Sequence, residues 1–438
     1  MNLSRALRIK TASPNNRIAF VGAGGKTAAI FQLARELTPP VLVTSTTHFG
    51  AWQIPLADQH IVSEEPNDIE DIPDGITLLT SPIEGDRTSP LPPLVLKDAE
   101  KLARKKNIPL LIECDGSRGL PLKAPAEHEP PIPDFVDTVI VVAGLSGLGQ
   151  PLDESHVHRP HLFSALSGLA PREPVTPAGV VRALLHPEGG LKNIPANARH
   201  ICLLNQADTT ELQAVAQGMA EDLLEIYDAV VIASLKDKTI HVAHEHVAGI
   251  ILAAGESTRF GKPKQLLDWR GEPFVRAVAK KALAAGLSPV VVVTGANAET
   301  VEAAVNDLTV SIVRNEDWRD GQSSSIVKGV ESLPQNIGAG IFLLADQPQV
   351  SVEVLRALTE CHRREMPAIA APLVGGERRG NPVLFDRVAF PDLLSLQGDV
   401  GGRAVFHKHK VEFLPWHDDA LLLDVDTPED YQRLIESN

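Results

Sequence analysis

Short apolar runs alternate with longer amphipathic stretches along the whole chain. The short runs are rich in Val, Ile and Leu, and such runs are typical of strands buried on both faces of a parallel sheet. They predict strands at residues 17–21, 41–44, 110–114, 138–143, 201–204, 229–233, 249–252, 289–294, 341–345 and 421–425. Residues 27–37, 274–285 and 298–305 have the apolar spacing of helices. Strands that alternate with helices indicate an α/β fold.

A glycine-rich motif follows the first predicted strand in each half of the chain. One motif lies at residues 22–27 and the other at residues 255–264. The two motifs differ, so they indicate two fused α/β domains, residues 1–242 and 247–438, rather than an internal repeat. Residues 64–93, which are rich in proline and acidic side chains, predict an irregular insertion in the first domain.

The composition narrows the classes of partner. The 438 residues carry a formal net charge of −15, and the sequence pI is about 5.5. A net negative charge argues against nucleic acid or an anionic membrane as the main partner and favours small molecules or other proteins. No run approaches the roughly 20 apolar residues that span a membrane, and the three cysteines share no motif spacing. We therefore expect a soluble, cytoplasmic protein with reduced thiols.

The segment IILAAGESTRFGKPK, residues 250–264, places a loop of small residues directly after a buried strand. Glycine in such a loop lets backbone N–H groups approach a phosphate chain closely. Arg259 and Lys264 offer positive charge to the phosphate oxygens and are the expected catalytic cations. The residues expected around the nucleotide are Ala253, Ala254, Gly255, Ser257 and Gly261. The alternative is a surface loop with two solvated cations.

Two acidic residues belong to other predicted strand ends of this half. Asp346 lies in the segment LLADQP, and Asp426 lies in LDVDTPE beside Asp424. Carboxylate oxygens are ligands that Mg²⁺ prefers, and the triphosphate of a nucleotide can supply further oxygens. Asp346 and Asp426 therefore predict a Mg²⁺ site, and Asp346 is also expected to be catalytic. Because each acid precedes a proline by two residues, each could instead be a helix N-cap.

The pattern G-x-S-x-R-x-G-x-x-K after a strand, together with LLADQP and LDVDTPE, resembles the molybdenum-cofactor nucleotidyltransferases. This family belongs to the wider sugar-nucleotide transferase-like fold, which is Rossmann-like and GT-A-like. The resemblance implies that a terminal phosphate of the acceptor attacks the α-phosphorus of an NTP in line and that pyrophosphate leaves. It assigns the stabilisation of charge in this step to Mg²⁺, Arg259 and Lys264.

Two further segments bear on the choice of nucleotide and acceptor. RGNPVLF at residues 379–385 and GDVGGR at residues 398–403, together with Ala-Ala-Gly after the first strand, resemble the cytidylyltransferase branch. The resemblance implies CTP and Mo-molybdopterin as substrates and molybdopterin cytosine dinucleotide as product. Asn381 departs from the histidine expected at its position. Asp399 is expected to orient the acceptor or to bind metal, although its segment could be a plain tight turn.

The segment GQSSS, residues 321–325, opens a helical pattern in the same half. Its hydroxyls, that of Ser324 among them, and the N–H groups at the start of the helix could hold a ribose or a phosphate, and ordinary N-capping is the alternative. Two rival functions stay open for this half. One is a guanylyltransferase or sugar-phosphate nucleotidyltransferase of the same fold, and the other is a nonenzymatic carrier or chaperone of finished cofactor.

In the first half, AFVGAGGKT at residues 19–27 leads from a strand into a glycine loop. The loop resembles a phosphate loop, except that Phe20 stands where G-x-x-x-x-G-K-[ST] requires glycine. It predicts a P-loop-like domain, and a plain strand–turn–helix junction is the alternative. Glu113 and Asp115 lie at the end of another predicted strand, and either could bind Mg²⁺ or orient a water molecule. Asp115 is the expected metal ligand. The residues expected to bind a second nucleotide, ATP or GTP, with its Mg²⁺ are Gly22, Gly24, Gly25, Lys26 and Thr27.

Four segments of the first half resemble the YqeC-like accessory family of selenium-dependent molybdenum hydroxylases: residues 22–27, 43–48, 115–130 and 156–163. The resemblance implies a maturation or delivery role towards a molybdenum hydroxylase apoenzyme of the xanthine dehydrogenase type. LNQAD at residues 204–208 resembles the guanine-reading motif N-K-x-D, with Gln206 in place of lysine. A turn at Asn205 and an N-cap at Asp208 are the alternative.

The first half carries four histidines that could bind a metal: His48, His156, His158 and His161. The spacing H-x-H-x-x-H is a weak metal signature, and no cysteine lies close to it. We expect His158 and Arg159 to bind an anion or to make a satisfied polar contact. Arg118 and Lys123, which follow Asp115, could bind an anionic substrate or could be solvated loop charges.

Overall fold

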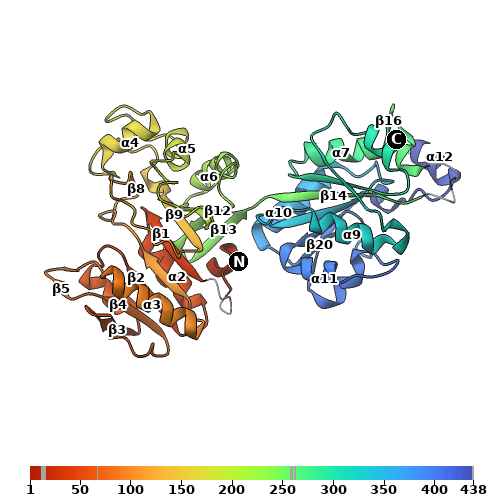
Figure 1. Cartoon of the computed structure of the whole chain (residues 1–438). Coiled ribbons are helices and arrows are strands. Elements are labelled where there is room, and N and C mark those ends of the chain that lie inside the picture. Colours follow the sequence, from red (N-terminus) through yellow and green to blue (C-terminus); the bar gives the residue numbers. More distant parts are fainter. Residues whose placement is uncertain (11–15, 67, 257–259, 261–262, 437–438) are drawn as a thin grey trace. The chain divides into compact units, whose positions relative to one another are not determined.

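The computed structural model describes residues 1–10, 16–66, 68–256, 260 and 263–436. The chain forms two compact units, Met1–His244 and Glu245–Asn438. Each unit has its own sheet and its own apolar core (Figure 1). Among the described residues, no helix is long and apolar enough to cross a membrane.

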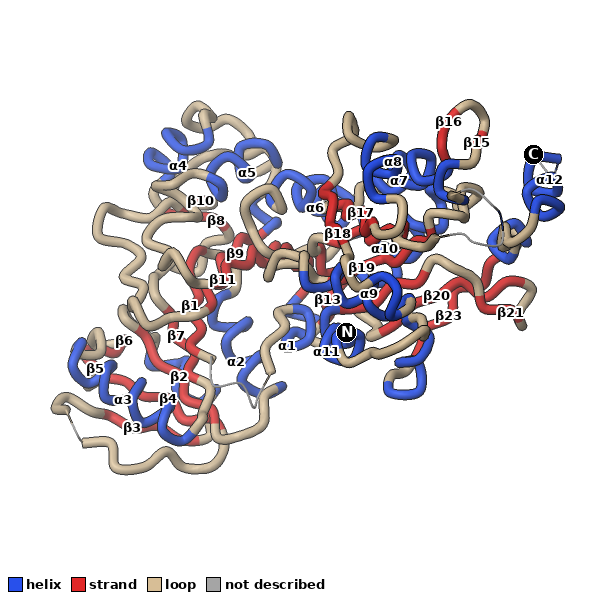
Figure 2. The backbone as a smooth tube through the Cα atoms, turned by 45° about the vertical axis from the view of Figure 1, so that its right-hand side comes forward, coloured by secondary structure: helices blue, strands red, loops and turns tan. Residues whose placement is uncertain are grey.

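The described part of the first unit is built on a nine-stranded sheet of order β13-β12-β11-β9-β1-β7-β2-β4-β3. Neighbouring strands are parallel except for the edge pair of β12 with β13. Figure 2 shows these strands in red. They are β1 (Arg17–Gly22), β2 (Val41–Ser45), β3 (Gln59–Val62), β4 (Ile76–Thr80), β7 (Leu110–Glu113), β9 (Thr138–Gly144), β11 (Arg199–Asn205), β12 (Ala229–Ser234) and β13 (Thr239–His244).

Helices and short strand pairs connect the strands of this sheet. The chain leaves β1 for β2 and returns later to place β7 between them, so β1 lies at a topological switch point. Open α/β sheets bind ligands at the carboxyl ends of strands at such points. The connecting elements are α1 (Leu3–Ala6), α2 (Lys26–Glu36), α3 (Pro93–Lys106), α4 (Pro160–Ser167), α5 (Pro177–Leu185), α6 (Thr210–Leu223), β5 (Ile83–Glu84), β6 (Arg87–Thr88), β8 (Leu122–Lys123) and β10 (Val157–His158).

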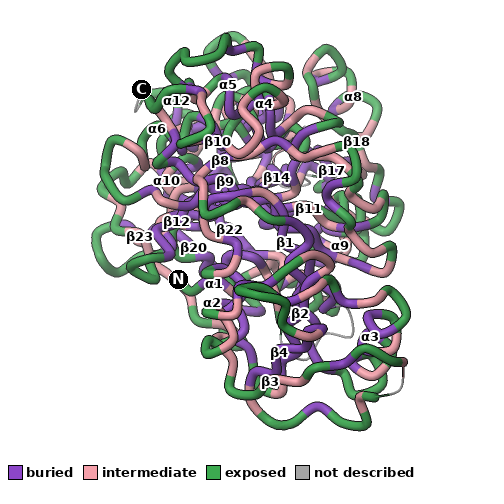
Figure 3. The backbone as a smooth tube through the Cα atoms, turned by 90° about the vertical axis from the view of Figure 1, so that its left-hand side faces the viewer, coloured by how far each residue is buried: buried purple, intermediate pink, exposed green. Residues whose placement is uncertain are grey.

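Burial on both faces explains why the apolar runs form strands. In β1, Ile18, Ala19 and Phe20 are each fully buried although successive side chains point to opposite faces. Figure 3 shows β1, β2 and β4 largely in the colour of buried residues. The facing helix α2 buries Ile30 and Leu33 on one stripe, at the spacing of an amphipathic helix.

The predicted irregular insertion at residues 64–93 is wrong. The run ITLLT within it forms β4, which is buried along its whole length and pairs in parallel with β2 and β3. Prolines lie on both sides of this run, at Pro73 and Pro82, but none lies inside it. These prolines therefore remove no hydrogen bond of the sheet within β4. The proline-rich composition of the surrounding segment led to the wrong prediction for this core strand.

The described part of the second unit is built on a mixed sheet of order β18-β17-β14-β19-β22-β20-β21, with β23 paired to β20. The strands β18, β17, β14 and β19 are parallel neighbours, and β22 runs antiparallel to β19. The strands are β14 (Val247–Ala253), β17 (Val290–Thr294), β18 (Ser311–Arg314), β19 (Ala339–Leu344), β20 (Ile369–Val374), β21 (Arg378–Arg379), β22 (Val383–Asp386) and β23 (Val411–Trp416).

Helices cover this second sheet, and their apolar faces form part of its core. In α7, Val275, Val278 and Ala282 are buried at helical spacing and pack in the same cluster as β14. The other elements are α7 (Phe274–Ala284), α8 (Ala298–Ala303), α9 (Gln322–Glu331), α10 (Val352–Glu365), α11 (Phe390–Leu394), α12 (Pro428–Glu436), β15 (Asp268–Trp269) and β16 (Glu272–Pro273).

The predicted strand at residues 421–425 is wrong. Asp418 caps a short 3-10 helix, Asp419–Leu422, and the chain then runs without a strand to α12. Leu421 and Val425 are buried and account for the apolar signal, but they anchor a loop. The other predicted strands differ from strands of the two sheets by no more than two residues at either end, which confirms the α/β class.

Candidate functional site

A cavity of about 720 Å³ opens in the second unit at the carboxyl ends of β14 and β19. These strands are parallel neighbours at the centre of the sheet, which is the place where α/β sheets bind ligands. The cavity is lined by Leu252, Ala254, Gly255, Glu256, Lys264, Gln265, Trp318, Arg319, Asp320, Gly321, Gln322, Ser325, Leu344, Ala345, Asp346 and Asp399. Several residues singled out in the sequence therefore meet here.

A lysine and two aspartates from distant segments form one charged cluster at this cavity. Lys264 Nζ donates a 2.6 Å hydrogen bond to Asp426 Oδ1 and lies 3.8 Å from Asp346 Oδ2. The Lys264 side chain is 12% exposed, whereas that of Asp346 is 34% and that of Asp426 is 58% exposed. The two carboxylates, one from the middle and one from the end of the second unit's sequence, thus face one cation.

The electrostatic surroundings of Asp346 favour a cation beside its carboxylate. Burial raises its pKa above the ordinary value, Lys264 offsets part of this effect, and Asp424 and Asp426 raise the pKa further. A positive ion beside these carboxylates would relieve both the burial and the repulsion. The oxygens of Asp346 and Asp426 fit a hard divalent cation. The described residues contain no group of three or more His, Cys, Asp and Glu side chains placed to hold a metal ion.

Neither aspartate is a helix cap. Ser351 is the N-cap of α10, with its hydroxyl accepting from the backbone N–H of Val354. At the start of α12, Asp430 accepts from the backbone N–H of Thr427, and Thr427 accepts from that of Asp430. The capping alternative for Asp346 and Asp426 is therefore excluded by where the caps lie.

Two glutamines, which sequence reasoning missed, tie together the segments that carry the acids. Gln347 Nε2 donates to Asp424 at 2.6 Å, and Gln349 Nε2 donates to the carbonyl of Leu423 at 2.7 Å. Both glutamines are nearly fully buried. Their signal in the sequence is the run DQPQ, in which amides replace the apolar residues that continue a core strand.

A third glutamine holds the small-residue loop after β14. Gln265 is 5% exposed and donates to the carbonyl oxygens of Gly255 at 2.7 Å and Ala253 at 3.3 Å. These two hydrogen bonds hold the carbonyls of Ala253 and Gly255 towards Gln265 at the cavity wall. The loop residues Ser257, Arg259 and Gly261 lie outside the described residues, and their roles stay predictions.

The start of α9 forms another part of the cavity wall. Asp399 Oδ1 accepts from the backbone N–H of Gln322 at 3.2 Å. The hydroxyl of Ser324 donates to a backbone carbonyl at 2.8 Å and accepts from Asn315 at 2.8 Å. It is therefore held by protein groups, and Ser325 rather than Ser324 lines the cavity.

A smaller cavity of about 290 Å³ shares Leu252, Gln322 and Leu344 with the first. Asn381 and Arg403 line it, and Arg403 Nη2 donates to Asn381 Oδ1 at 3.4 Å. The structure thus brings the segments RGNPVLF and GDVGGR to one place. RGNPVLF lines only the smaller cavity, whereas GDVGGR lines both, since Asp399 belongs to the wall of the larger one.

In the first unit, the glycine loop between β1 and α2 has a backbone that requires glycine. Gly22, Gly24 and Gly25 have φ values of 94°, 82° and 121°. A Cβ on Gly24 would lie 2.4 Å from the backbone of Gly144, and one on Gly22 would lie 2.2 Å from the carbonyl of Val142. The loop is therefore packed tightly against the end of β9.

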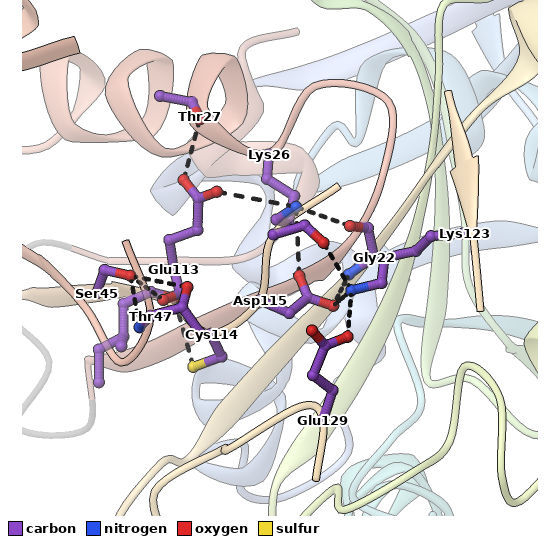
Figure 4. Close-up of polar contacts among 12 residues, drawn as sticks. Gly22, Lys26, Thr27, Ser45, Thr47, Glu113, Cys114, Asp115, Lys123 and Glu129 are labelled. Carbon is purple, nitrogen blue, oxygen red and sulfur yellow. Dashed lines mark hydrogen bonds and ion pairs between the residues drawn. The ribbon is translucent and has the colours of Figure 1, made fainter. Parts of the chain in front are cut away.

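Lys26 is held beneath this loop by two acids from β7 and its end (Figure 4). Its Nζ donates to the carbonyl of Gly22 at 2.7 Å and lies 3.3 Å from Asp115 and 3.8 Å from Glu113. Burial lowers the pKa of Lys26, but Asp115 and Glu113 outweigh it and the pKa lies above the ordinary value. Lys26 is therefore a buried cation.

The acid that contacts Thr27 is Glu113. Thr27 Oγ1 donates to Glu113 at 3.0 Å and accepts from Gln53 at 2.9 Å. Asp115, the metal ligand expected from the sequence, instead accepts from Lys123 at 2.8 Å and from the backbone N–H of Gly22 at 3.1 Å. The metal role of Asp115 stays a prediction, and Glu113 is the carboxylate placed beside the hydroxyl.

The alternative interpretation of LNQAD, a turn at Asn205 and an N-cap at Asp208, is wrong. Asn205 is buried, donates to the carbonyl of Gly24 at 2.7 Å and accepts from the backbone N–H of Leu235 at 3.0 Å. It therefore braces the glycine loop against the end of β12. The N-cap of α6 is Thr209.

Comparisons with known proteins agree with this division into two units. Residues 249–413 match the model of the MobA-like NTP transferase domain, and residues 18–161 match the model of the YqeC protein family. The second unit is a nucleotidyltransferase, and its substrates are small molecules. The chain belongs to the MobA-like NTP transferase family through its second unit and to the YqeC family through its first.

Three relatives illustrate the range of names. YqeC of Escherichia coli K12, described as an uncharacterized protein, is 35% identical over 48% of this chain and 83% of its own length. Nicotine blue oxidoreductase of Paenarthrobacter nicotinovorans is 36% identical over 43% of this chain and 96% of its own. A Bacillus cereus protein named "Probable molybdenum cofactor guanylyltransferase" is 32% identical over 30% of this chain and 64% of its own.

Among solved structures, Rv0371c of Mycobacterium tuberculosis H37Rv is 30% identical over 44% of this chain and 98% of its own, with a TM-score of 0.40. These relatives include one named as a transferase and one named as an oxidoreductase. The names of these relatives therefore do not determine the acceptor or the nucleotide base.

Proposed function

We propose that the second unit transfers CMP from CTP to Mo-molybdopterin and releases pyrophosphate, with molybdopterin cytosine dinucleotide as product. The observation that carries this proposal is the cluster of Lys264, Asp346 and Asp426 beside the Ala-Ala-Gly loop, at the carboxyl ends of β14 and β19. A glycine-containing loop after a strand, a cation and two carboxylates are groups that suit a metal–triphosphate complex.

The chain's own residues supply positioning and charge. The backbone of the loop from Ala253 holds the phosphates, and Lys264 stabilises negative charge on the α-phosphate and on the departing pyrophosphate. Asp346 and Asp426 would hold Mg²⁺, which when bound neutralises triphosphate charge. Because the largely buried Lys264 ammonium is already fixed between the acids, little reorganisation is needed at the moment of reaction.

The bond changes are simple. A terminal phosphate oxygen of the acceptor forms a bond to the α-phosphorus of CTP, and the bond from the α-phosphorus to the bridging β-phosphate oxygen breaks. Pyrophosphate carries away the electron pair of that bond. The acceptor phosphate is already ionised at neutral pH, so the step requires no side chain to act as a base for the nucleophile.

The adjoining cavity supports an acceptor site next to the nucleotide. It combines a cation, Arg403, and an amide, Asn381, with apolar walls from Phe342, Val383 and Phe385. Such walls suit a flat heterocycle, and the arginine suits an anionic group. Ala-Ala-Gly at the nucleotide loop favours CTP over GTP, and a guanylyl or sugar-phosphate transferase is the alternative within the same reaction class.

The first unit is proposed to be a P-loop-like domain that binds a second nucleotide, ATP or GTP, on its glycine loop. The positive φ angles of the loop, the nearby Lys26 and the Thr27–Glu113 pair support this assignment. A bound Mg²⁺ would be held by Thr27 with Glu113 or Asp115. We infer that this unit assists the maturation of a molybdenum hydroxylase apoenzyme that receives the finished cofactor.

Product analysis tests the transferase proposal. The full-length protein is incubated with Mo-molybdopterin, Mg²⁺ and an equimolar mixture of CTP and GTP, and the products are identified by mass spectrometry. Formation mainly of the cytosine dinucleotide is expected. The guanine dinucleotide as main product would reject the choice of base, and cofactor binding without any dinucleotide would favour the carrier function.

A further inference from the structure

The first unit contains a second cavity, of about 580 Å³, that neither the transferase site nor the glycine loop uses. It opens near the carboxyl ends of β2 and β7, which carry Thr47 and His48 and the segment from Gly116 to Leu120. Because β1 and β7 are parallel neighbours, this cavity lies on the same edge of the sheet as the glycine loop. Three arginines line it: Arg87, Arg118 and Arg159.

Part of the positive charge that lines this cavity is not neutralised by close ion pairs. Arg118 is exposed and makes no hydrogen bond or ion pair with another described residue, and Arg87 has Asp86 at 3.9 Å on the open surface. Arg159 is different, because it donates to both oxygens of Glu129, at 2.7 and 2.8 Å. The exposed Glu154 also lines the cavity, and its negative charge offsets part of the positive charge of Arg118 and Arg87. A planar guanidinium without a partner is a ready donor pair for a phosphate.

Histidines give this cavity further hydrogen-bonding groups. His48, His128, His158 and His161 line it. Burial, together with the charges of Arg159, Lys123 and Arg118, lowers the pKa of His158 to about 4. At neutral pH His158 is therefore uncharged, and a positive field surrounds it. The described residues contain no cluster of three metal-binding side chains, so the histidines do not assemble a metal site there.

The backbone around this cavity is held in costly conformations. Arg118 and Arg159 have φ values of 54° and 62°, in the left-handed region that non-glycine side chains rarely adopt. Such outliers persist where the surrounding structure over-determines them, and they gather at binding sites. The loop after β7 thereby sets the direction of Arg118, and the start of α4 sets that of Arg159.

A buried chain of ion pairs joins the cavity to the glycine loop, and Figure 4 shows its inner part. Lys26 contacts Asp115, Asp115 contacts Lys123, and Lys123 contacts Glu129 at 2.9 Å. Glu129 in turn holds Arg159. With Glu113, which also lies beside Lys26, this chain holds three positive and three negative charges, so Arg118 and Arg87 remain to attract an anion.

We propose that this cavity, which we call the basic cavity, binds a small molecule that carries phosphate, with Arg118 as its main anchor. The volume exceeds that of a phosphate ion, so the ligand has an organic part. The histidines donate to or accept from its polar groups. The ligand is separate from the nucleotide on the glycine loop, and the basic cavity does not depend on the transferase reaction of the second unit.

Site-resolved labelling of histidines by diethyl pyrocarbonate tests this proposal on the full-length protein. Inorganic pyrophosphate is the probe, and peptide mass spectrometry reports His128 and His161 in the basic cavity and His407, an exposed histidine of the second unit. We expect pyrophosphate to slow labelling of His128 and His161 and to leave His407 unchanged. Succinate, an anion without phosphate, should protect poorly.

Two variants locate the anchor. Arg118→Gln should raise the half-protecting concentration of pyrophosphate by about tenfold, because it removes a charge-assisted contact. Arg172→Gln is the matched control, since Arg172 is also exposed and has a φ of 68° but does not line the basic cavity. No protection in the unaltered protein, equal protection by succinate, or an Arg118→Gln response equal to that of the control would each overturn the proposal.

Discussion

Lys264 donates a 2.6 Å hydrogen bond to Asp426 across 162 residues of sequence. The lysine follows the first strand of the second unit, whereas the aspartate precedes its last helix. Asp346, which follows β19, approaches the same ammonium. Three segments of this unit therefore converge on one charged cluster, and an active site at this cluster predicts how individual substitutions behave.

Asp346→Asn should lower kcat by about 10²–10³-fold, because the variant keeps the shape of the side chain and removes the charge that a metal–triphosphate complex needs. Steady-state rates of pyrophosphate release with Mg²⁺ measure the effect. Glu360→Gln, which removes an exposed carboxylate on α10, is the control and should retain the normal rate. Near-normal turnover of a folded Asp346→Asn variant would place the active site elsewhere.

A fragment that begins at Ala243 should fold alone and keep the transferase activity. The second unit has its own apolar clusters, and the proposed substrate cavities are lined by its residues alone. Circular dichroism and the rate of pyrophosphate release of the purified fragment check this. A folded but inactive fragment would show that the first unit contributes to the transferase site.

Lys26→Ala should weaken the first unit and spare the second. The substitution leaves Glu113 buried without its cation and Asp115 with Lys123 alone, and breaking a buried pair costs on the order of 3–5 kcal/mol. Hydrogen exchange read by peptide should rise in β1 and β7 but not in β14, and nucleotide binding by the first unit should be lost. Lys97→Ala, at an exposed position of α3, is the control. Loss of pyrophosphate release in Lys26→Ala would mean that the two glycine loops serve one coupled reaction.

Glu129 should stabilise the first unit in a pH-dependent way. Burial favours its neutral form, but Arg159 and Lys123 outweigh this and lower its pKa to about 2 from an ordinary value of 4.5. The stabilisation is therefore complete above pH about 4.5 and is lost as the pH falls from about 4.5 towards 2. Denaturant unfolding of Glu129→Gln and of the unaltered protein should differ clearly at pH 7 and less at pH 3. The neighbouring exposed Glu127→Gln should show no such pattern, and a difference that is constant with pH would contradict the ion-pair account.

The elements that could be predicted from sequence are those whose signal is local. Apolar runs such as β1 and β9 are buried on both faces, so composition alone reveals them. The strand β4 was hidden by flanking prolines, and residues 421–425 looked like a strand because Leu421 and Val425 anchor a loop in the core. In both cases long-range packing, which a local pattern does not contain, decides the outcome.

The candidate sites divide in the same way. Asp346 and Lys264 were identified because each follows a strand in a recognisable motif. The supporting amides Gln265, Gln347 and Gln349 were missed, because their partners are backbone or side-chain groups distant in sequence. The contact of Thr27 with Glu113 likewise depends on the register of two neighbouring elements that the sequence does not state.

The most direct test of the transferase claim is the release of pyrophosphate by the purified full-length protein with Mo-molybdopterin and each of the four NTPs in turn. We predict that release requires the acceptor and a divalent metal, is fastest with CTP, and matches the dinucleotide formed mole for mole. Absence of pyrophosphate with every NTP, from a protein that still binds the cofactor, would contradict the account.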